Sequence, residues 1–293
     1  MNIQLMSGGL ANQIRQYVFV RYVERRNPEQ IWIFDDTYFF QDDVPHNGYE
    51  LESVFGLQVN LASRYFPKDV WDGIVRLSKQ GAFLPQILLN AGLPVVLEES
   101  TTGHGFFHGE TVSHIPGEYT SEVWTYPYSN MYYFDYWIED DWFHQDREEN
   151  LKELCFPALT DAPNLRYASW IEESMSVGIH IRRGGFVDNG WAVSEQEYLC
   201  ACQKTLARFP EAHFFVFSDE LDWCKAHAEE MGLNLADRTI YVEGNDQGKN
   251  YIDMQLMSMC RGIIRPDQSS FSQVAAWLDC NLKFETKLGK IYT

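Results

Sequence analysis

The sequence has 293 residues, of which 45% are hydrophobic and 15% aromatic. This is enough apolar material for one large or two smaller folded domains, and it excludes an intrinsically disordered chain. With 23 Lys and Arg against 42 Asp and Glu, the formal net charge is −19, so the surface repels nucleic acid and we expect no nucleic-acid partner.

The first part of the sequence has the pattern of a strand, a glycine turn, a helix and a second strand. Gly8 and Gly9 interrupt the opening apolar run, and the apolar residues that follow recur with the 3.6-residue period of a helix. The segment 42–163 is less regular, and within it the stretch Gly103–Phe143 is dense in aromatic residues. The elements expected in this part are strands within Met1–Met6 and over Ile31–Phe34, and helices over Leu10–Arg26 and Gln145–Leu154.

Strands and helices alternate after Thr160–Asn164, which we predict to be an inter-domain linker. Four strand–helix units in succession predict a parallel sheet with helices on both faces. The predicted fold class is α/β, with two Rossmann-like lobes, residues 1–160 and 165–293, and a central cleft between them. The strands are expected over Ser176–Ile181, Phe214–Phe217, Thr239–Val242 and Gly262–Ile264, and the helices over Glu195–Arg208, Leu221–Met231, Tyr251–Cys260 and Phe271–Asp279.

The sequence shows no signal for membrane insertion or for a disulfide framework. No window approaches the roughly 18 apolar residues of a spanning helix, and the start lacks a signal-peptide pattern, so we expect a cytoplasmic protein, free or peripheral at the inner membrane. The six cysteines form no Cys-x-x-Cys pair. We expect free thiols, five of them on buried helix faces, in preference to disulfides or a zinc site.

Two adjacent arginines, Arg182 and Arg183, follow a strand of buried type, and two glycines follow them. In parallel α/β sheets the carboxyl ends of the strands are where ligands bind, and the guanidinium group is a planar, permanently charged partner for phosphate oxygens. In so acidic a chain, this pair favours an anion site over a solvated strand end. His180, within the strand, is equally compatible with a core histidine and with a ligand contact.

Two further segments could supply hydrogen-bond donors to a phosphate. The turn at Gly8 and Gly9 opens a helix next to Asn12, although a tight turn without a ligand would explain it as well. Ser269 and Ser270 stand at a helix start, where one serine would serve as the cap. Asp253, early in another helix, could complement the helix dipole or accept the paired N–H groups of guanine.

Five motifs in this order and approximate spacing resemble the bacterial α-1,2-fucosyltransferases of glycosyltransferase family 11, within the wider fucosyltransferase superfamily. The motifs extend from residue 7 to residue 278. The resemblance implies a GT-B-like fold, with an N-terminal acceptor-side lobe and a C-terminal donor-binding lobe. The motifs are SGGLANQIRQYVFVR (Ser7–Arg21), YFDYWIEDDWF (Tyr133–Phe143), GIHIRRGG (Gly178–Gly185), FFVFSDELDWCK (Phe214–Lys225) and DMQLMSMCRGIIRPDQSSFSQVAAWL (Asp253–Leu278).

The resemblance also implies an inverting reaction that needs no metal, with GDP-fucose as donor and a galactose-terminated glycan as acceptor. Arg182 would stabilise the charge that grows on the β-phosphate of the leaving GDP. The other donor-binding positions that the resemblance implies are Gly8, Gly9, Asn12, His180, Arg183, Asp219, Asp253, Ser269, Ser270 and Phe271. No Asp-x-Asp metal motif accompanies them, although loose acidic doublets exist.

Three positions depart from the family pattern: Gly185 replaces an Asp, Ala11 a Gly, and Gln273 a Trp. The family also tends to carry a final strand and helix, and we expect this chain to stop short of them. Without a carboxylate at position 185, the candidates for the catalytic base are Asp188, which we rank first, Glu195 and Glu197. These departures leave open a GDP-sugar-binding pseudoenzyme or a transferase with another nucleotide sugar.

The aromatic residues between Phe106 and Phe143 have two interpretations. Most are expected to form core. Some of Trp124, Tyr126, Tyr128 and Trp137 could instead stack on acceptor sugar rings, because flat apolar faces suit the C–H surfaces of pyranoses.

Overall fold

The computed structural model describes residues 1–44, 46–99, 107–113, 126–139, 141–246 and 248–289. The chain forms two compact units, Met1–Cys155 and Phe156–Thr293. The predicted linker residues Ala162, Pro163 and Asn164 instead belong to helix α8. Asp161 caps this helix, because its carboxylate accepts a hydrogen bond from the backbone N–H of Asn164 at 3.0 Å.

The first unit is built on a five-stranded parallel sheet with the order β2-β1-β5-β3-β4. The predicted opening strand and helix are confirmed, and the helix has the predicted bounds. The elements are β1 (Asn2–Leu5), α1 (Leu10–Arg26), β2 (Trp32–Asp35), the 3₁₀ helix η1 (Thr37–Phe40), α2 (Leu51–Phe55), α3 (Ala62–Tyr65), α4 (Lys68–Ser78), α5 (Leu84–Asn90), β3 (Val96–Glu99), β4 (Thr111–Val112), β5 (Met131–Phe134), α6 (Asp141–His144) and α7 (Arg147–Glu153).

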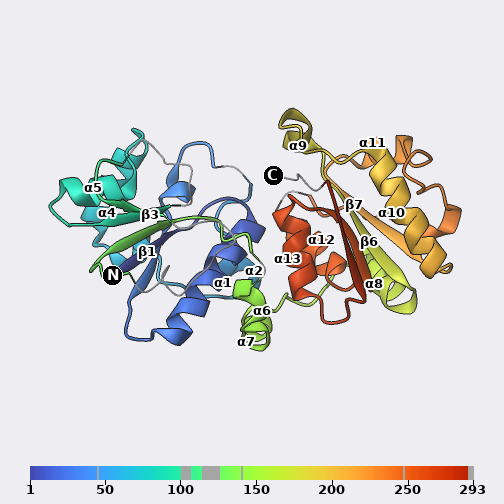
Figure 1. The fold of residues 1–293 in the computed structure, drawn as a ribbon, viewed down its shortest axis with the longest axis horizontal. Coiled ribbons are helices and arrows are strands. Elements are labelled where there is room, and N and C mark those ends of the chain that lie inside the picture. The colour runs from blue at the N-terminus through green and yellow to red at the C-terminus, as the bar shows by residue number, and fades with distance from the viewer. Residues whose placement is uncertain (45, 100–106, 114–125, 140, 247, 290–293) are drawn as a thin grey trace. The chain divides into compact units, whose positions relative to one another are not determined.

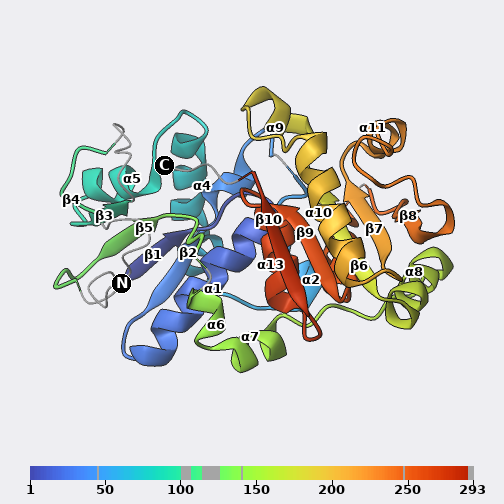
Figure 2. The same ribbon diagram turned by 45° about the vertical axis from the view of Figure 1, so that its right-hand side comes forward.

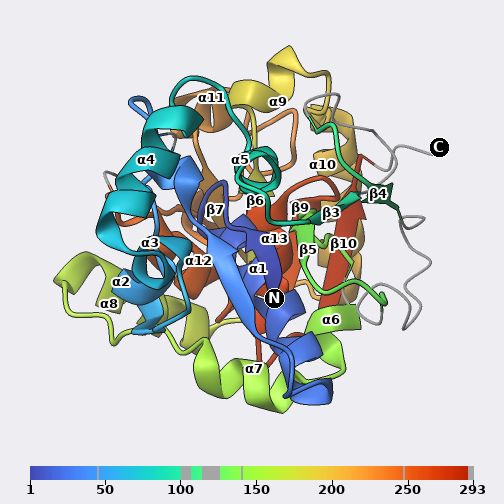
Figure 3. The same ribbon diagram turned by 90° about the vertical axis from the view of Figure 1, so that its left-hand side faces the viewer.

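Side chains alternate between the two faces of this sheet, as expected for strands. On one face, apolar residues such as Ile3 and Ile33 pack with Trp71 of α4 and Leu84 of α5. Figure 3, with the first unit facing the viewer, shows α4 and α5 beside the strands, and α6 and α7 close to the end of α1.

The other face of the first sheet carries an aromatic core. The rings of Phe19 and Trp137 are stacked with centroids 3.5 Å apart, and the Trp137 indole donates a hydrogen bond to the Gln4 side chain at 2.8 Å. Trp137 is fully buried, so the suggestion that it stacks on an acceptor sugar is wrong, whereas the core interpretation of the aromatic segment is confirmed for Trp137, Trp142 and Phe143. Trp124 lies outside the described residues.

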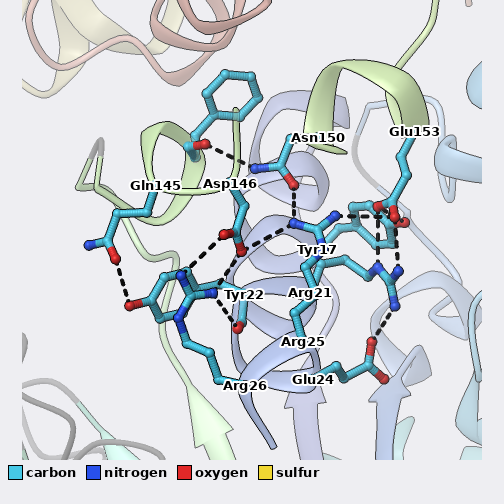
Figure 4. A network of polar contacts seen from close by, with 11 residues as sticks. Tyr17, Arg21, Tyr22, Glu24, Arg25, Arg26, Gln145, Asp146, Asn150 and Glu153 are labelled. Carbon is cyan, nitrogen blue, oxygen red and sulfur yellow. Dashed lines mark hydrogen bonds and ion pairs between the residues drawn. The ribbon is translucent and has the colours of Figure 1, made fainter. Parts of the chain in front are cut away.

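A cluster of ion pairs holds α7 against the outer side of α1 (Figure 4). Glu153 accepts hydrogen bonds from Arg21 and from the Tyr17 hydroxyl, each at 2.8 Å, and Asp146 pairs with Arg25 at 3.3 Å. Although burial pushes the pKa of Glu153 upward, the hydrogen bonds from Arg21 and Tyr17 hold it below its ordinary value. Arg21, Arg25 and Arg26 of α1 therefore stabilise the fold of this unit.

The second unit also contains a five-stranded parallel sheet, with the order β10-β9-β6-β7-β8 (Figure 2). Strand β6 and helix α10 have the predicted bounds, whereas α9 and β10 were not predicted, so a final strand is present after all. The elements are α8 (Ala162–Glu173), β6 (Ser176–Ile181), α9 (Gly184–Asp188), α10 (Glu195–Arg208), β7 (His213–Ser218), α11 (Leu221–Ala226), η3 (Ala236–Arg238), β8 (Thr239–Tyr241), α12 (Asn250–Met257), β9 (Gly262–Pro266), α13 (Ser270–Leu278) and β10 (Phe284–Leu288).

Helices cover both faces of the second sheet, as the strand–helix alternation predicted. Figure 1 shows α10 on one side of β6 and β7, and α12 and α13 on the other. All six cysteines are free thiols, but only Cys202, Cys224 and Cys260 are buried, so the expectation of five buried cysteines is wrong. In the part of the chain that the structure covers, no helix is long and apolar enough to cross a bilayer.

Candidate donor-binding site

The strand order of the second unit fixes where a ligand site is expected. Strand β6 lies between β7 and β9, and the chain winds outward from it in both directions. Between β6 and β9 the direction in which successive strands are added reverses. The loops after these two strands therefore diverge and leave a crevice at their carboxyl ends. Arg182 directly follows β6, while Ser269 and Ser270 follow β9 at the start of α13. The topology therefore places these predicted residues along one edge of the sheet.

Arg182 presents a partly exposed guanidinium group at this edge. Its Nη1 atom lies 2.7 Å from Oδ2 of Asp219, at the end of β7, and 38% of the side chain is exposed. No other ion pair involves Arg182 in the described residues. Since the guanidinium group carries five N–H donors, one carboxylate fixes its orientation and leaves donors for an anion.

Arg183 has a different environment, which holds the turn after β6 in place. Its Nε lies 3.1 Å from the Glu220 carboxylate, and its guanidinium carbon lies 3.5 Å from the centroid of the Trp223 ring. The Glu220 carboxylate also accepts a hydrogen bond from the backbone of Gly184 at 3.1 Å. These contacts favour a role for Arg183 in bracing the loop, and its binding to the nucleotide stays a prediction.

Gly184 is required by the close approach of Asp219. An added Cβ at Gly184 would lie 2.6 Å from Oδ2 of Asp219, the atom that pairs with Arg182. The other carboxylate oxygen of Asp219 accepts the backbone N–H of Arg183 at 3.0 Å. Asp219, predicted to border the nucleotide, thus ties the end of β7 to the turn that Arg182 and Arg183 form after β6, which we call the arginine turn.

His180 belongs to β6 and is buried against α13. Its Nδ1 atom lies 2.9 Å from the Ser272 hydroxyl and 3.1 Å from the Ser269 hydroxyl. Burial, followed by the charges of Arg182 and Arg265, lowers the pKa of His180 to about 3, so the imidazole is neutral at physiological pH. The core-histidine interpretation accounts for these contacts, and a direct contact with the nucleotide stays a prediction.

The serines at the start of α13 divide into two groups. Ser269 and Ser272 are buried and bind His180, whereas Ser270 and Phe271 are only partly buried. Ser270 is therefore the hydroxyl at this helix start that is best placed to meet a phosphate, and the Phe271 ring lies 5.4 Å from the His180 ring.

Asp253 belongs to a polar cluster that the sequence did not reveal. The Asn245 amide donates to its carboxylate at 2.7 Å, and Asn245 in turn exchanges hydrogen bonds of 2.8 and 3.0 Å with Asn164. Burial raises the pKa of Asp253 to about 7, against the opposing hydrogen bond from Asn245. Asn164 and Asn245 are 81 residues apart in the sequence, so the spacing of residues could not have predicted their contact.

The candidate bases differ in how they are engaged. Asp188 is exposed as the last residue of α9. Glu197, the third residue of α10, completes a capping box with Ser194: its carboxylate accepts a hydrogen bond from the Ser194 hydroxyl at 3.0 Å, and another from the backbone N–H of Gly289 at 3.0 Å. The Ser-x-x-Glu pattern at 194–197 was a sequence signal for this structural role. Glu195 lies in the first turn of the same helix.

In the first unit, Gly8 and Gly9 form the turn between β1 and α1. Gly8 has a φ of +75°, and an added Cβ would lie 2.7 Å from Nδ2 of Asn12, so only glycine fits. The fully buried Gln13 donates to the carbonyl of Gly8 at 2.9 Å. The turn thus has a structural explanation, and phosphate binding by Gly8, Gly9 and Asn12 stays a prediction.

An open hollow of about 620 Å³ lies beside the arginine turn and includes Asp219, Glu220, Trp223, Lys225 and Glu243 in its lining. Among the residues that are described, no group of three or more His, Cys, Asp and Glu side chains is placed to hold a metal ion.

Comparison with known proteins identifies the family. An α-1,2-colitosyltransferase of Escherichia coli is 26% identical over 281 residues, which cover 93% of this chain and 86% of the relative. The mouse galactoside α-(1,2)-fucosyltransferase 2 is 26% identical over 217 residues, covering 65% and 58%. A crystal structure of POFUT1 in complex with GDP-fucose aligns over 99% of this chain and 98% of that chain, with a TM-score of 0.53 and 10% identity, which supports the fold alone.

The α/β fold with two parallel sheets is GT-B-like, as expected. The sequence profile of glycosyl transferase family 11 matches residues 106–285, more than half of the chain and including the arginine turn, Asp253 and the start of α13. The chain therefore belongs to glycosyl transferase family 11 and is a glycosyltransferase.

Proposed function

We propose that this enzyme transfers L-fucose from GDP-fucose to the 2-hydroxyl of a galactose-terminated glycan, with inversion at the anomeric carbon and without a metal ion. The observation that carries the proposal is the position of Arg182, held by Asp219 at the carboxyl end of β6, beside the start of α13. The family match and the galactoside α-(1,2)-fucosyltransferase relatives support the choice of sugar and linkage.

In the proposed donor complex, the second unit binds GDP. Arg182 and the Ser270 hydroxyl donate to the β-phosphate, while Arg183, held by Glu220 and Trp223, keeps the turn rigid. The carboxylate of Asp253 accepts the two adjacent N–H groups of the guanine edge, and Asn245 orients it. Two parallel N–H···O hydrogen bonds to one carboxylate select guanine, because adenine and the pyrimidines do not present the same pair of adjacent N–H donors.

The chemistry follows from where charge develops. The acceptor oxygen attacks the anomeric carbon, the bond to the β-phosphate oxygen breaks, and the bonding pair leaves with GDP. A guanidinium group fixed before the reaction stabilises that growing negative charge without having to reorganise, and removal of such a donor costs about 3 kcal/mol, or two decades in rate. Charge stabilisation by Arg182 would make a metal ion unnecessary.

The proton of the acceptor hydroxyl must pass to a base within about 3 Å. Asp188 fits this role best of the three candidates, because it is exposed and Glu197 is engaged in the helix cap. The glycan would be presented by the first unit.

A second candidate donor is a nucleotide-activated colitose. The relative named as an α-1,2-colitosyltransferase matches along most of this chain, and colitose differs from fucose only in lacking the 3-hydroxyl. A GDP-sugar-binding protein without transfer activity is the alternative that Gly185 motivates.

A donor panel tests the proposal. The intact chain is incubated with lactose and with GDP-fucose, GDP-mannose, a UDP-sugar or the colitose donor, with and without EDTA, and products are identified by mass spectrometry and by NMR of the new linkage. We expect fucosyllactose with an α-1,2 linkage and no loss with EDTA. Transfer from a UDP-sugar, or GDP binding without turnover of any donor, would contradict the proposal.

A further inference from the structure

A second hollow, in the first unit, has the lining of a sugar-binding subsite. It measures about 600 Å³, within the range of small-molecule sites, and we call it the aromatic hollow. Its lining includes Asp36, Phe39, Phe40, His46, Tyr49 and Arg64. Aromatic rings beside a small number of polar groups are the composition that binds pyranoses, whose C–H faces are apolar and whose edges carry hydroxyls.

The aromatic hollow lies at the carboxyl edge of the first sheet. Asp36 directly follows β2, and the His46 ring lies against Gly9 in the turn after β1, where an added Cβ would be 3.3 Å from it. The buried Gln13 side chain joins them, because its amide donates to the carbonyl of Gly8 at 2.9 Å and to that of Gly48 at 2.8 Å. The carboxyl edge is where parallel α/β sheets bind ligands.

The charges of the aromatic hollow suit a neutral ligand. Arg64, the arginine of the lining, forms an ion pair with Glu52. The Asp36 carboxylate is buried and accepts hydrogen bonds from the backbone and the hydroxyl of Ser63, at 3.0 and 2.5 Å. The buried Asp36 carboxylate would repel a nucleoside diphosphate, whereas a sugar hydroxyl can donate to its remaining lone pairs.

Tyr49 adds an unsatisfied polar group. Its hydroxyl is buried and has no hydrogen-bond partner among the described residues, while its ring centroid lies 5.8 Å from that of Phe39. Buried hydroxyls are nearly always paired, so an unpaired one marks a place where a ligand or water hydroxyl would be favourable. By contrast, Tyr126 and Tyr128, suggested from the sequence as stacking residues, line a hollow with Met1 at the opposite, amino-terminal edge of the sheet.

We propose that the aromatic hollow binds a neutral galactose ring of the acceptor glycan, with Phe39 and Phe40 against its C–H face and Asp36 and Tyr49 bonded to its hydroxyls. This inference rests on the proposed function, since it assigns the acceptor of the same reaction. It places acceptor selection in the 36–64 segment, which precedes the part of the chain that matches the family profile.

Two substitutions test the aromatic hollow with lactose as the probe. Tyr49→Phe removes only the hydroxyl, and it should fold normally because that hydroxyl has no protein partner in the described structure. Phe40→Ala removes a ring that is 39% exposed. The matched control is Tyr65→Phe, which removes a hydroxyl from a nearby tyrosine that is 52% exposed and lies outside the hollow.

We expect each hollow variant to raise the KM for lactose about three- to tenfold, with a smaller effect on kcat and on the KM for GDP-fucose, while Tyr65→Phe matches the wild type. An unchanged KM for lactose in both hollow variants would overturn the inference and leave the proposed function standing.

Saturation-transfer NMR separates the inference from a failure of the proposed function. If the wild type transfers no fucose but a lactose signal is seen and weakens in Phe40→Ala, the hollow is a sugar site although the reaction is wrong. If the wild type gives no lactose signal, the galactose assignment of the hollow is overturned.

Discussion

Replacement of Asp253 by Asn should increase stability and abolish guanine recognition at the same time. The folded protein raises the pKa of this carboxyl from 3.8 to about 7 through burial. Because the folded protein binds this proton more tightly than the unfolded chain does, the protonated carboxyl contributes to the free energy of unfolding in full below pH 3.8. This contribution is lost as the pH rises through 7. At pH 8 the buried charge therefore costs up to about 4 kcal/mol, at about 1.4 kcal/mol per pK unit.

The Asn variant cannot ionise, and its side-chain oxygen can accept the same hydrogen bond from Asn245. We expect it to be about 2 to 4 kcal/mol more stable than the wild type at pH 8, with a difference that shrinks towards pH 4. Urea unfolding at several pH values measures this. Asp246→Asn, an exposed neighbour, is the control.

The same substitution should weaken GDP binding about 10- to 150-fold, because a hydrogen bond to a charged group is worth about 1.5–3 kcal/mol. Inosine diphosphate lacks the 2-amino group of guanine, so the wild type should prefer GDP and the variant should lose the preference. Wild-type affinity for GDP should rise between pH 6 and 8, as the carboxyl ionises. Calorimetry with both nucleotides tests this, and a less stable variant with unchanged GDP affinity would refute the assignment.

Three other substitutions test separate parts of the account. Trp223→Ala removes the ring that packs on Arg183, and it should lower kcat/KM for GDP-fucose about three- to tenfold with an unchanged circular dichroism spectrum. An unchanged kcat/KM would refute the bracing role of Arg183. Glu153→Ala should destabilise the protein by about 2 kcal/mol in urea unfolding, whereas the exposed Glu149→Ala should change it by under about 0.5 kcal/mol. Gly185→Asp meets no atom within 4 Å at its Cβ, so it should fold normally and, if a carboxylate there can act as base, raise kcat about tenfold or more.

The parts of the fold that the sequence predicted are those with strong local signals. Helix α1 and strand β6 were predicted with their observed bounds, because a glycine turn and a clear apolar period mark them. Strand β10 was missed because Phe284–Leu288 is an edge strand whose three central residues are polar or charged, so its hydrophobic pattern is weak. Strand β5 was missed in a segment where aromatic residues obscure the period. Strand β3 was missed because its four residues, two apolar and two glutamates, are too few to show an alternation.

The sequence predicted which residues lie at the donor-binding site better than it predicted what each of them does there. The arginine turn could be found from its position after a strand. The division of labour between Arg182 and Arg183 depends on Asp219, Glu220 and Trp223, which lie more than thirty residues further along the chain. Tertiary contacts of this kind leave no trace in local spacing. The buried state of His180 likewise follows from the packing of α13 on β6.

The most direct test of the account is the rate of fucosyl transfer by Arg182→Ala, with GDP affinity and unfolding measured in parallel. Because Arg182 is partly exposed and makes one ion pair in the described structure, the variant should fold. The account predicts a fall of about two decades in kcat/KM, with Arg182→Lys recovering only part of it. Transfer from GDP-fucose at a near wild-type rate would contradict the claim that this guanidinium group stabilises the leaving diphosphate.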